Sequence, residues 1–166
     1  MVDEASTRSD LLLVLGETVN EAAEFFADVD EDLFDGYQKA REVLSHLVFW
    51  QREYSKVIKA LRNGRQPELK SGTFVELNAA ATVEFRKVPM SELTYQFALH
   101  QNQLAQELKL LSDWEVNFPV KCGGRVKSVS ERLPAIESHI RNHVNRLKRA
   151  QRLGEAWVKA YYSAES

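Results

Sequence analysis

The sequence predicts an all-α protein, an up-and-down-type four-helix bundle with a short extra helix between the second and third main helices. Three observations favour this class. Apolar residues recur at helical spacing in four long segments, Gly and Pro residues interrupt the chain between them, and no segment shows the clear alternation of a half-buried strand. At 166 residues the chain is long enough for one domain with a sizeable core. We therefore expect a single domain over residues 1–166.

The first predicted helix spans about residues 9–26 and follows a polar tail of residues 1–8. Ser9 or Asp10 can cap it, because both side chains accept hydrogen bonds from free backbone N–H groups. The acidic segment 28–36 ends this helix and is expected to be a solvated connection. One side of the helix carries the apolar residues Leu11, Leu15, Val19, Ala22 and Phe26.

The second predicted helix, about residues 37–61, has the clearest pattern in the chain. Its apolar residues are spaced 4, 3, 4, 3 and 4 apart, which is typical of a helix-bundle seam. On a helical wheel His46 lies roughly 60° from the centre of this stripe, so we expect it at the border of the seam. The helix ends at Asn63-Gly64. The stripe consists of Val43, Leu47, Trp50, Tyr54, Val57 and Leu61.

Two further helices are predicted before the last one. A short helix within residues 73–87 is interrupted by Pro89, and the third main helix spans about residues 91–111. His100 lies on the inner stripe of that third helix. The inward residues are Phe74, Leu77, Ala81 and Phe85 in the short helix, and Leu93, Phe97, Leu104, Leu108 and Leu111 in the long one.

The last helix follows an irregular stretch, residues 112–128. It begins near Ser128 or Ser130 and is predicted to reach as far as Tyr162. His143 lies inside its apolar arc and His139 at the edge of that arc. The inward residues are Leu133, Ile136, Ile140, Val144, Leu147 and Leu153, with Trp157 further on; the opposite face carries Arg141, Asn145, Lys148, Arg149 and Arg152.

Composition and charge argue against several classes of partner and location. A formal charge of −2, with 28% charged residues, gives no general attraction to nucleic acid or anionic lipid. Cys122 is the single cysteine, so no intrachain disulfide can form, which suits a reducing compartment. The acidic N-terminus and the short apolar run at residues 11–15 fit neither a signal peptide nor a membrane span. We expect a cytoplasmic protein with no nucleic-acid or membrane partner.

The four histidines suggest a metal site. His139 and His143 are four residues apart, so both side chains lie on one helix face. If the second and last helices are neighbours, His46 converges with them, and three neutral imidazoles suit a divalent transition metal with an open position. The alternative is that these are hydrogen-bonded core histidines, as many partly buried ones are. His100 is a candidate pocket-lining residue or fourth ligand, or again a core histidine.

Other candidate residues lie near these histidines. Trp50, one turn after His46, is a candidate wall of a pocket or simply a core residue of the seam. Glu42, Glu53 and Glu137 could orient an imidazole or accept a proton, although surface carboxylates are the simpler interpretation. Cys122, beside Gly123-Gly124, is a candidate nucleophile or an extra metal ligand, although an ordinary loop thiol is the simpler interpretation.

An ordered set of segments resembles the DinB-like metalloprotein superfamily, and is most similar to its ClbS/DfsB-type branch. The resemblance extends over about residues 9–155. It rests on Ala40-Arg-Glu-Val-Leu-Ser-His46-Leu-Val-Phe-Trp50, on Leu61-Arg-Asn-Gly64, on Pro67-Glu-Leu69, on Leu77-Asn78 and on the helix with His139-x-x-x-His143.

The resemblance implies a four-helix bundle, frequently a homodimer, with a metal held by one histidine of the second helix and two of the last. Carried over to this sequence, the ligands are His46, His139 and His143. Some members are thiol-dependent transferases or isomerases, and a ClbS-type member opens a cyclopropane by hydrolysis. We expect Zn²⁺ or Ni²⁺, because imidazole suits both.

Three functions therefore remain open from the sequence. The first is a metal-dependent hydrolase or thiol-dependent transferase that acts on a small electrophilic molecule, in detoxification or self-protection. The second is a non-catalytic protein that binds or sequesters a small molecule in the same cavity. The third is a purely structural dimerising bundle. The sequence does not decide whether the protein is an enzyme.

Overall fold

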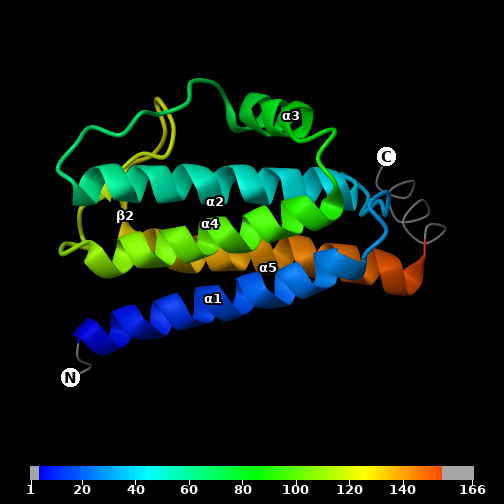
Figure 1. The fold of residues 1–166 in the computed structure, drawn as a ribbon, viewed down its shortest axis with the longest axis horizontal. Coiled ribbons are helices and arrows are strands. Elements are labelled where there is room, and N and C mark those ends of the chain that lie inside the picture. The colour runs from blue at the N-terminus through cyan, green and yellow to red at the C-terminus, as the bar shows by residue number, and fades with distance from the viewer. Residues whose placement is uncertain (1–3, 155–166) are drawn as a thin grey trace.

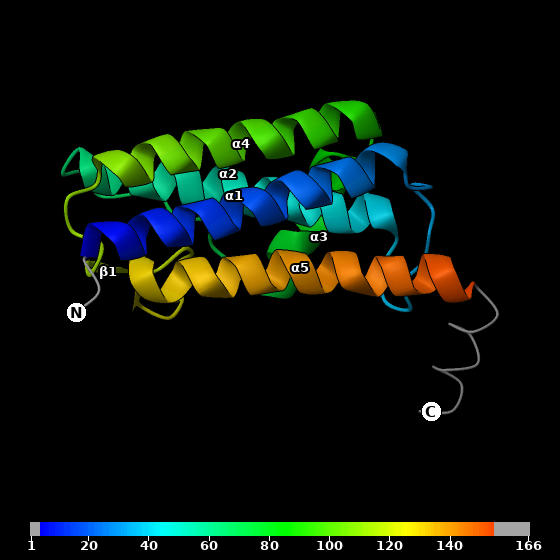
Figure 2. The same ribbon diagram turned by 90° about the horizontal axis from the view of Figure 1, so that it is seen from below.

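Four long helices lie side by side along one axis in the computed structural model, which describes residues 4–154 (Figures 1 and 2). A short helix, α3, lies on the outer side of α2. The all-α four-helix bundle with an extra short helix is confirmed. The elements are α1 (Glu4–Asp28), α2 (Ala40–Arg62), α3 (Phe74–Glu84), α4 (Met90–Leu110), β1 (Asn117–Phe118), β2 (Lys127–Ser128) and α5 (Val129–Leu153).

Helix direction follows from the connections. Figure 1 shows α1 and α5 running one way along the bundle, and α2 and α4 running the opposite way. The segment 63–89, which contains α3, carries the chain back along α2, so α4 starts at the same end as α2. α4 packs against α2 and α1, and α1 packs against α5, whereas α2 and α5 hardly touch. The bundle is thus closely packed on three sides and loose on the fourth.

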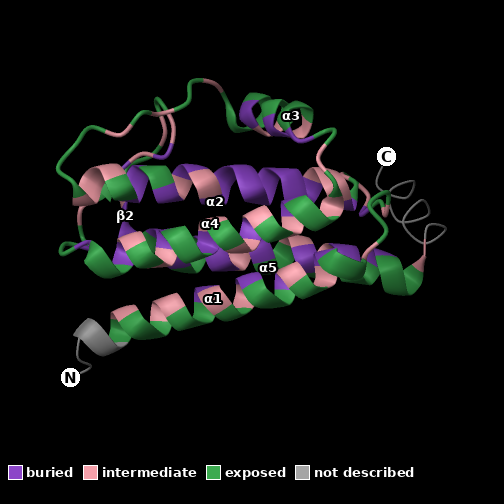
Figure 3. Cartoon of the chain, in the orientation of Figure 1, coloured by how far each residue is buried: buried purple, intermediate pink, exposed green. Residues whose placement is uncertain are grey.

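The predicted seams form the core (Figure 3). Four predicted inward residues of α4 are buried, and so is Leu111 directly after it; the four are Leu93, Phe97, Leu104 and Leu108. Three other predicted core residues, Leu11, Tyr54 and Leu61, are only partly buried, and two are exposed. Phe74, the first residue of α3, is 52% exposed, and Leu153, the last residue of α5, is 42% exposed, because each lies at a helix end beyond the packed length. Trp157 and the predicted extension to Tyr162 lie outside the described residues.

Two helix boundaries are set by reciprocal hydrogen bonds. The Ser128 Oγ accepts a hydrogen bond from the Glu131 backbone N–H at 3.2 Å, while the Glu131 carboxylate accepts from the Ser128 backbone N–H. Thr73 and Glu76 form the same arrangement at the start of α3. A side chain that satisfies a free N–H group fixes the first turn. Of the two predicted starts of the last helix, Ser128 is therefore confirmed.

Other boundaries differ from the expected ones. Residues 4–8, predicted as part of a polar tail, belong to α1. Arg8 explains this, because its guanidinium donates to the Ser112 carbonyl at 3.1 Å and lies over the Trp114 ring. The predicted irregular stretch contains the two-residue strands β1 and β2, which pair antiparallel and were not expected. No helix within residues 4–154 is both long and apolar enough to span a membrane.

Candidate functional site

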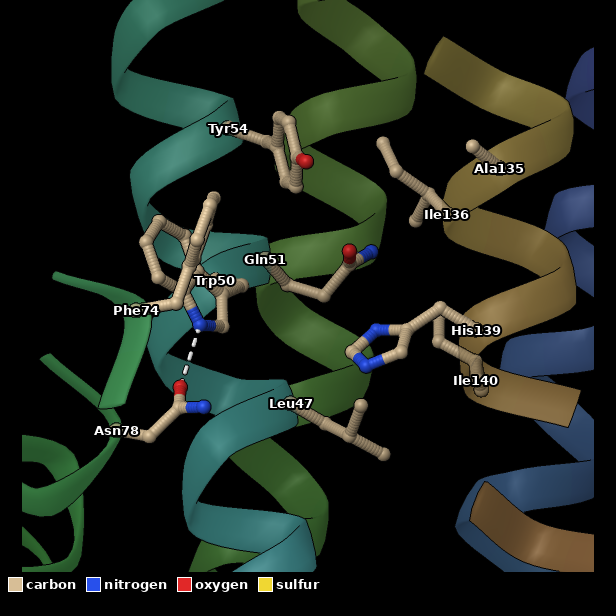
Figure 4. A pocket seen from close by; sticks show the side chains of 10 residues that line it. All are labelled: Leu47, Trp50, Gln51, Tyr54, Phe74, Asn78, Ala135, Ile136, His139 and Ile140. Carbon is tan, nitrogen blue, oxygen red and sulfur yellow. Dashed lines mark hydrogen bonds between the residues drawn. The ribbon is translucent and has the colours of Figure 1, made fainter. Parts of the chain in front are cut away.

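A cavity of about 310 Å³ opens where α2 and α5 do not pack against each other. α2, α3 and α5 supply its walls (Figure 4). Because α3 lies on the outer side of α2, it closes part of this otherwise open side. The lining consists of Leu47, Trp50, Gln51, Tyr54, Phe74, Asn78, Ala135, Ile136, His139 and Ile140.

Trp50 joins α2 to α3 at the cavity. Its ring centroid is 5.3 Å from that of Phe74, and its indole Nε1–H donates to the Asn78 Oδ1 at 2.8 Å (Figure 4). The indole is also largely buried in the seam of α2, at 9% exposure. Both interpretations of Trp50 therefore hold, since the same residue packs in the core and lines the cavity.

The rings of His139 and His143 converge. Their Nε2 atoms are 3.0 Å apart, and their ring centroids are 4.6 Å apart. Two imidazole ligands at 2.0–2.1 Å from a tetrahedral zinc ion have nitrogens about 3.3 Å apart. The observed separation is that of a hydrogen bond between the two rings, about 0.3 Å shorter than this distance, so the rings need only a small movement apart to hold one ion. His139 also lines the cavity, so an ion at this pair would border on the cavity (Figure 4).

Both histidines of the pair are neutral at pH 7. Burial lowers the pKa of His143 to about 4, and the charges of His139, Arg146 and His46 act in the same direction. Burial and Arg146 also lower the pKa of His139. Neutral imidazoles need not lose a proton before they bind a metal. The Nδ1 of His143 is buried without a hydrogen-bond partner, whereas a metal-bound histidine usually has one there.

His46 lies near this pair, but its ring is hydrogen-bonded to Thr82 of α3. The His46 Nε2 and the Thr82 Oγ1 share a hydrogen bond at 3.0 Å. Burial lowers the pKa of His46 to about 4; the Asn78 backbone acts against this change, and His139 acts with it. Within residues 4–154, no three His, Cys, Asp or Glu side chains are arranged as ligands of one ion. The pair therefore fits a divalent metal, whereas a three-histidine site requires His46 to leave Thr82.

His100 lies elsewhere. It does not line the cavity; its Nδ1 is 3.0 Å from the Gln103 Oε1 on the same helix. Arg52 and Lys56 of α2 are its charged neighbours, and together with burial they lower its pKa. The predicted pocket-lining position is not observed, because α4 faces α2 on the side away from α5 and the cavity.

The candidate carboxylates and Cys122 have other environments. Glu53 is 2% exposed and lies 3.6 Å from the Arg52 Nε, so it is not the surface carboxylate expected. Glu137 is also buried. It accepts a hydrogen bond from the Thr18 Oγ1 at 2.8 Å, which joins α5 to α1, and it forms an ion pair with Arg141 within α5. Cys122 is exposed in a loop and does not line the cavity.

Several polar residues of the site were missed from the sequence. Gln51 is 2% exposed, and its Nε2 donates to the Gln101 Oε1 of α4 at 2.6 Å. Its position four residues after Leu47, on the apolar side of α2, was a usable signal, since a polar side chain there must find a partner. Asn78 and Thr82 had no such signal, because their roles depend on where α3 lies.

Comparison with known proteins finds a similar fold but no similar sequence. No protein-family model and no curated protein sequence matches this chain. The crystal structure of the mycothiol-dependent maleylpyruvate isomerase superposes with a TM-score of 0.69 at 12% sequence identity, over 84% of this chain and 60% of that chain. This chain thus spans less than two thirds of the isomerase's length. The likeness shows that the two proteins share this all-α bundle fold.

Proposed function

We propose that the protein binds a divalent metal ion, Zn²⁺ or Ni²⁺, at His139 and His143 and acts on a small electrophilic molecule in the adjoining cavity. The observation that carries this proposal is the 3.0 Å separation of the two Nε2 atoms at the cavity wall. When bound, the metal supplies a Lewis acid and an activated water or thiol. His46 is the proposed third ligand, after its ring nitrogen leaves Thr82.

The reaction class is hydrolysis or thiol-dependent transfer, in the manner of a detoxifying enzyme. The fold is shared with a protein whose name describes a thiol-dependent isomerase, which supports the thiol alternative. The chain's own contribution is positional. His139 and His143 hold the ion at one wall, Trp50 and Phe74 form the opposite wall, and the electrophile lies between them.

A non-catalytic binding protein is the second candidate. It is favoured by the hydrogen bond between His46 and Thr82, which already satisfies the third proposed ligand. In this function the cavity holds the small molecule, His139 lines it as a hydrogen-bonding group, and His143 holds the ring of His139.

Metal analysis distinguishes these functions. We expect protein purified without a histidine tag to carry near-stoichiometric metal, and His143→Ala to bind Zn²⁺ or Ni²⁺ at least ~10-fold more weakly in calorimetric titration. His100→Ala is the matched control, since that histidine lies outside the cavity and should leave the affinity unchanged. Wild-type protein that stays metal-free after reconstitution would support the binding protein instead.

Thr82→Val tests the role of His46. The valine has a similar shape but no hydroxyl, so His46 loses the partner that competes with the metal. A hydrogen bond of this kind contributes about 1 kcal/mol, so we expect metal affinity to rise about fivefold in the same titration. An unchanged affinity would show that His46 is not a ligand and that solvent or substrate completes the site.

A further inference from the structure

We propose that the cavity selects uncharged aromatic molecules that carry a hydrogen-bond-accepting oxygen, and that Tyr54, supported by Arg132, donates the hydrogen bond to that oxygen. The inference rests on the proposed use of the cavity as a ligand site and names its substrate class. It does not depend on the metal.

The cavity lining argues against charged ligands. None of its ten residues is Asp, Glu, Lys or Arg. A charged group enclosed there would lose its hydration without an ion-pair partner in the lining, which is costly. Arg132 is not one of the lining residues, so its charge reaches the cavity only through Tyr54. The walls are instead the rings of Trp50, Phe74 and Tyr54, with Leu47 and Ile140 between them. An apolar cavity of about 150 Å³ holds benzene, so 310 Å³ has room for a substituted aromatic ring.

The amides of the lining are partly engaged with the protein. The Gln51 Nε2 already donates to Gln101, and the Asn78 Oδ1 already accepts from Trp50. Figure 4 shows the Tyr54 hydroxyl on the α5 side of its ring, directed into the space between α2 and α5. The Asn78 Nδ2 is a further donor in the lining, on the α3 side. Tyr54 is the donor with a buried cation next to it.

Arg132 lies behind Tyr54 as a buried positive charge. It is 8% exposed, its Nη2 donates to the carbonyls of Phe118 and Arg125, and its Nε has no hydrogen-bond partner. No ion pair of the described residues includes Arg132. A small void of about 10 Å³ is lined by both Tyr54 and Arg132 and shares Ile136 with the cavity. The charge therefore acts at the Tyr54 end of the cavity.

A buried guanidinium strengthens the hydroxyl next to it as a donor. Hydrogen bonds in a low-dielectric interior polarise one another, so a phenol that faces a cation donates more strongly. Burial raises the pKa of Tyr54, and Arg132 acts against this rise, so the proton stays on the oxygen at neutral pH. The hydrogen bond would stabilise negative charge that develops on a carbonyl or ether oxygen during reaction. Tyr54 is thus the contact residue, and Arg132 is a positioning residue.

Three probes of one size test the proposal: ethylbenzene, acetophenone and benzoate. Binding is followed by NMR through the indole N–H signal of Trp50 in ¹⁵N-tryptophan-labelled protein. We expect Tyr54→Phe to weaken acetophenone about fivefold, the loss of one hydrogen bond, and to leave ethylbenzene unchanged. Tyr95→Phe, at an exposed tyrosine of α4, should change neither. In metal-free protein, benzoate should bind at least tenfold more weakly than acetophenone, because no cation then borders the cavity.

The role of Arg132 is tested by the infrared spectrum of the bound ligand. The infrared carbonyl stretch of bound, ¹³C-labelled acetophenone should shift to lower frequency in the wild type, shift less in Arg132→Lys, and return to its value in apolar solvent in Tyr54→Phe. Three results would overturn the inference. They are an equal loss of affinity for ethylbenzene and acetophenone in Tyr54→Phe, tighter binding of benzoate than of acetophenone, and no binding of any probe. The metal titration is independent, so probe binding without metal would overturn only the proposed metal function.

Discussion

Lowering the pH from 7 to 4 should reduce the free energy of unfolding of the metal-free protein by about 3 kcal/mol through His46 alone. Burial lowers the pKa of this histidine from 6.5 to about 4. Between these values the unfolded chain takes up a proton on His46 and the folded chain does not. The stabilisation is therefore fully present above pH 6.5, is lost as the pH falls to 4, and decreases no further below that. His143, whose pKa is lowered in the same way, adds to the effect.

Urea unfolding in the presence of EDTA measures this dependence. His46→Gln keeps a polar group near Thr82 but cannot take up the proton, so its stability should fall less between pH 6.5 and pH 4. His100→Gln is the control, because that histidine is only half-buried and faces Gln103. A wild type and a His46→Gln variant with parallel pH profiles would contradict the prediction.

Phe97→Ala should destabilise the protein by about 3–5 kcal/mol, a large share of the usual total of about 5–15 kcal/mol. Phe97 is fully buried in α4, the helix that packs against both α2 and α1, so its removal leaves a cavity between three helices. Tyr95→Ala on the same helix is the matched control, since that ring is 61% exposed. Chemical denaturation should separate the two variants clearly, and similar midpoints would show that α4 packs less closely than its burial indicates.

Helix positions were predictable wherever one periodic stripe decides burial. The inward residues of α4 needed only the 3.6-residue repeat, because α4 packs against two long helices, α2 and α1. The same repeat identified the stripe of α2, although part of that stripe lines the cavity instead of facing a long helix. Ser128 could be identified as a helix start because its capping partner, Glu131, lies three residues away in the sequence. The start of α1 could not, because Arg8 is held by Ser112 and Trp114, more than a hundred residues away in the chain.

The site was only partly predictable, because some of its contacts are local in the sequence and others join remote parts of the chain. The convergence of His139 with His143 follows from four-residue spacing within one helix. The full burial of His46 depends on α3, which covers a border that a helical wheel leaves open. Arg132 showed no sign of its role, because an arginine in the first turns of a helix is ordinarily solvent-exposed. The resemblance to the DinB-like superfamily and to its ClbS/DfsB-type branch stays a prediction.

The placement of α3 has a consequence for how the protein could diversify. This helix packs mainly on α2 and is joined to the bundle by two connections rich in exposed residues. It nevertheless supplies Phe74 and Asn78 to the cavity and Thr82 to His46. Substitutions or length changes in α3 can therefore alter one wall of the cavity while the contacts among the four long helices persist. The walls that α2 and α5 supply do not have this freedom, because Leu47, Ile136 and Ile140 belong to the core as well.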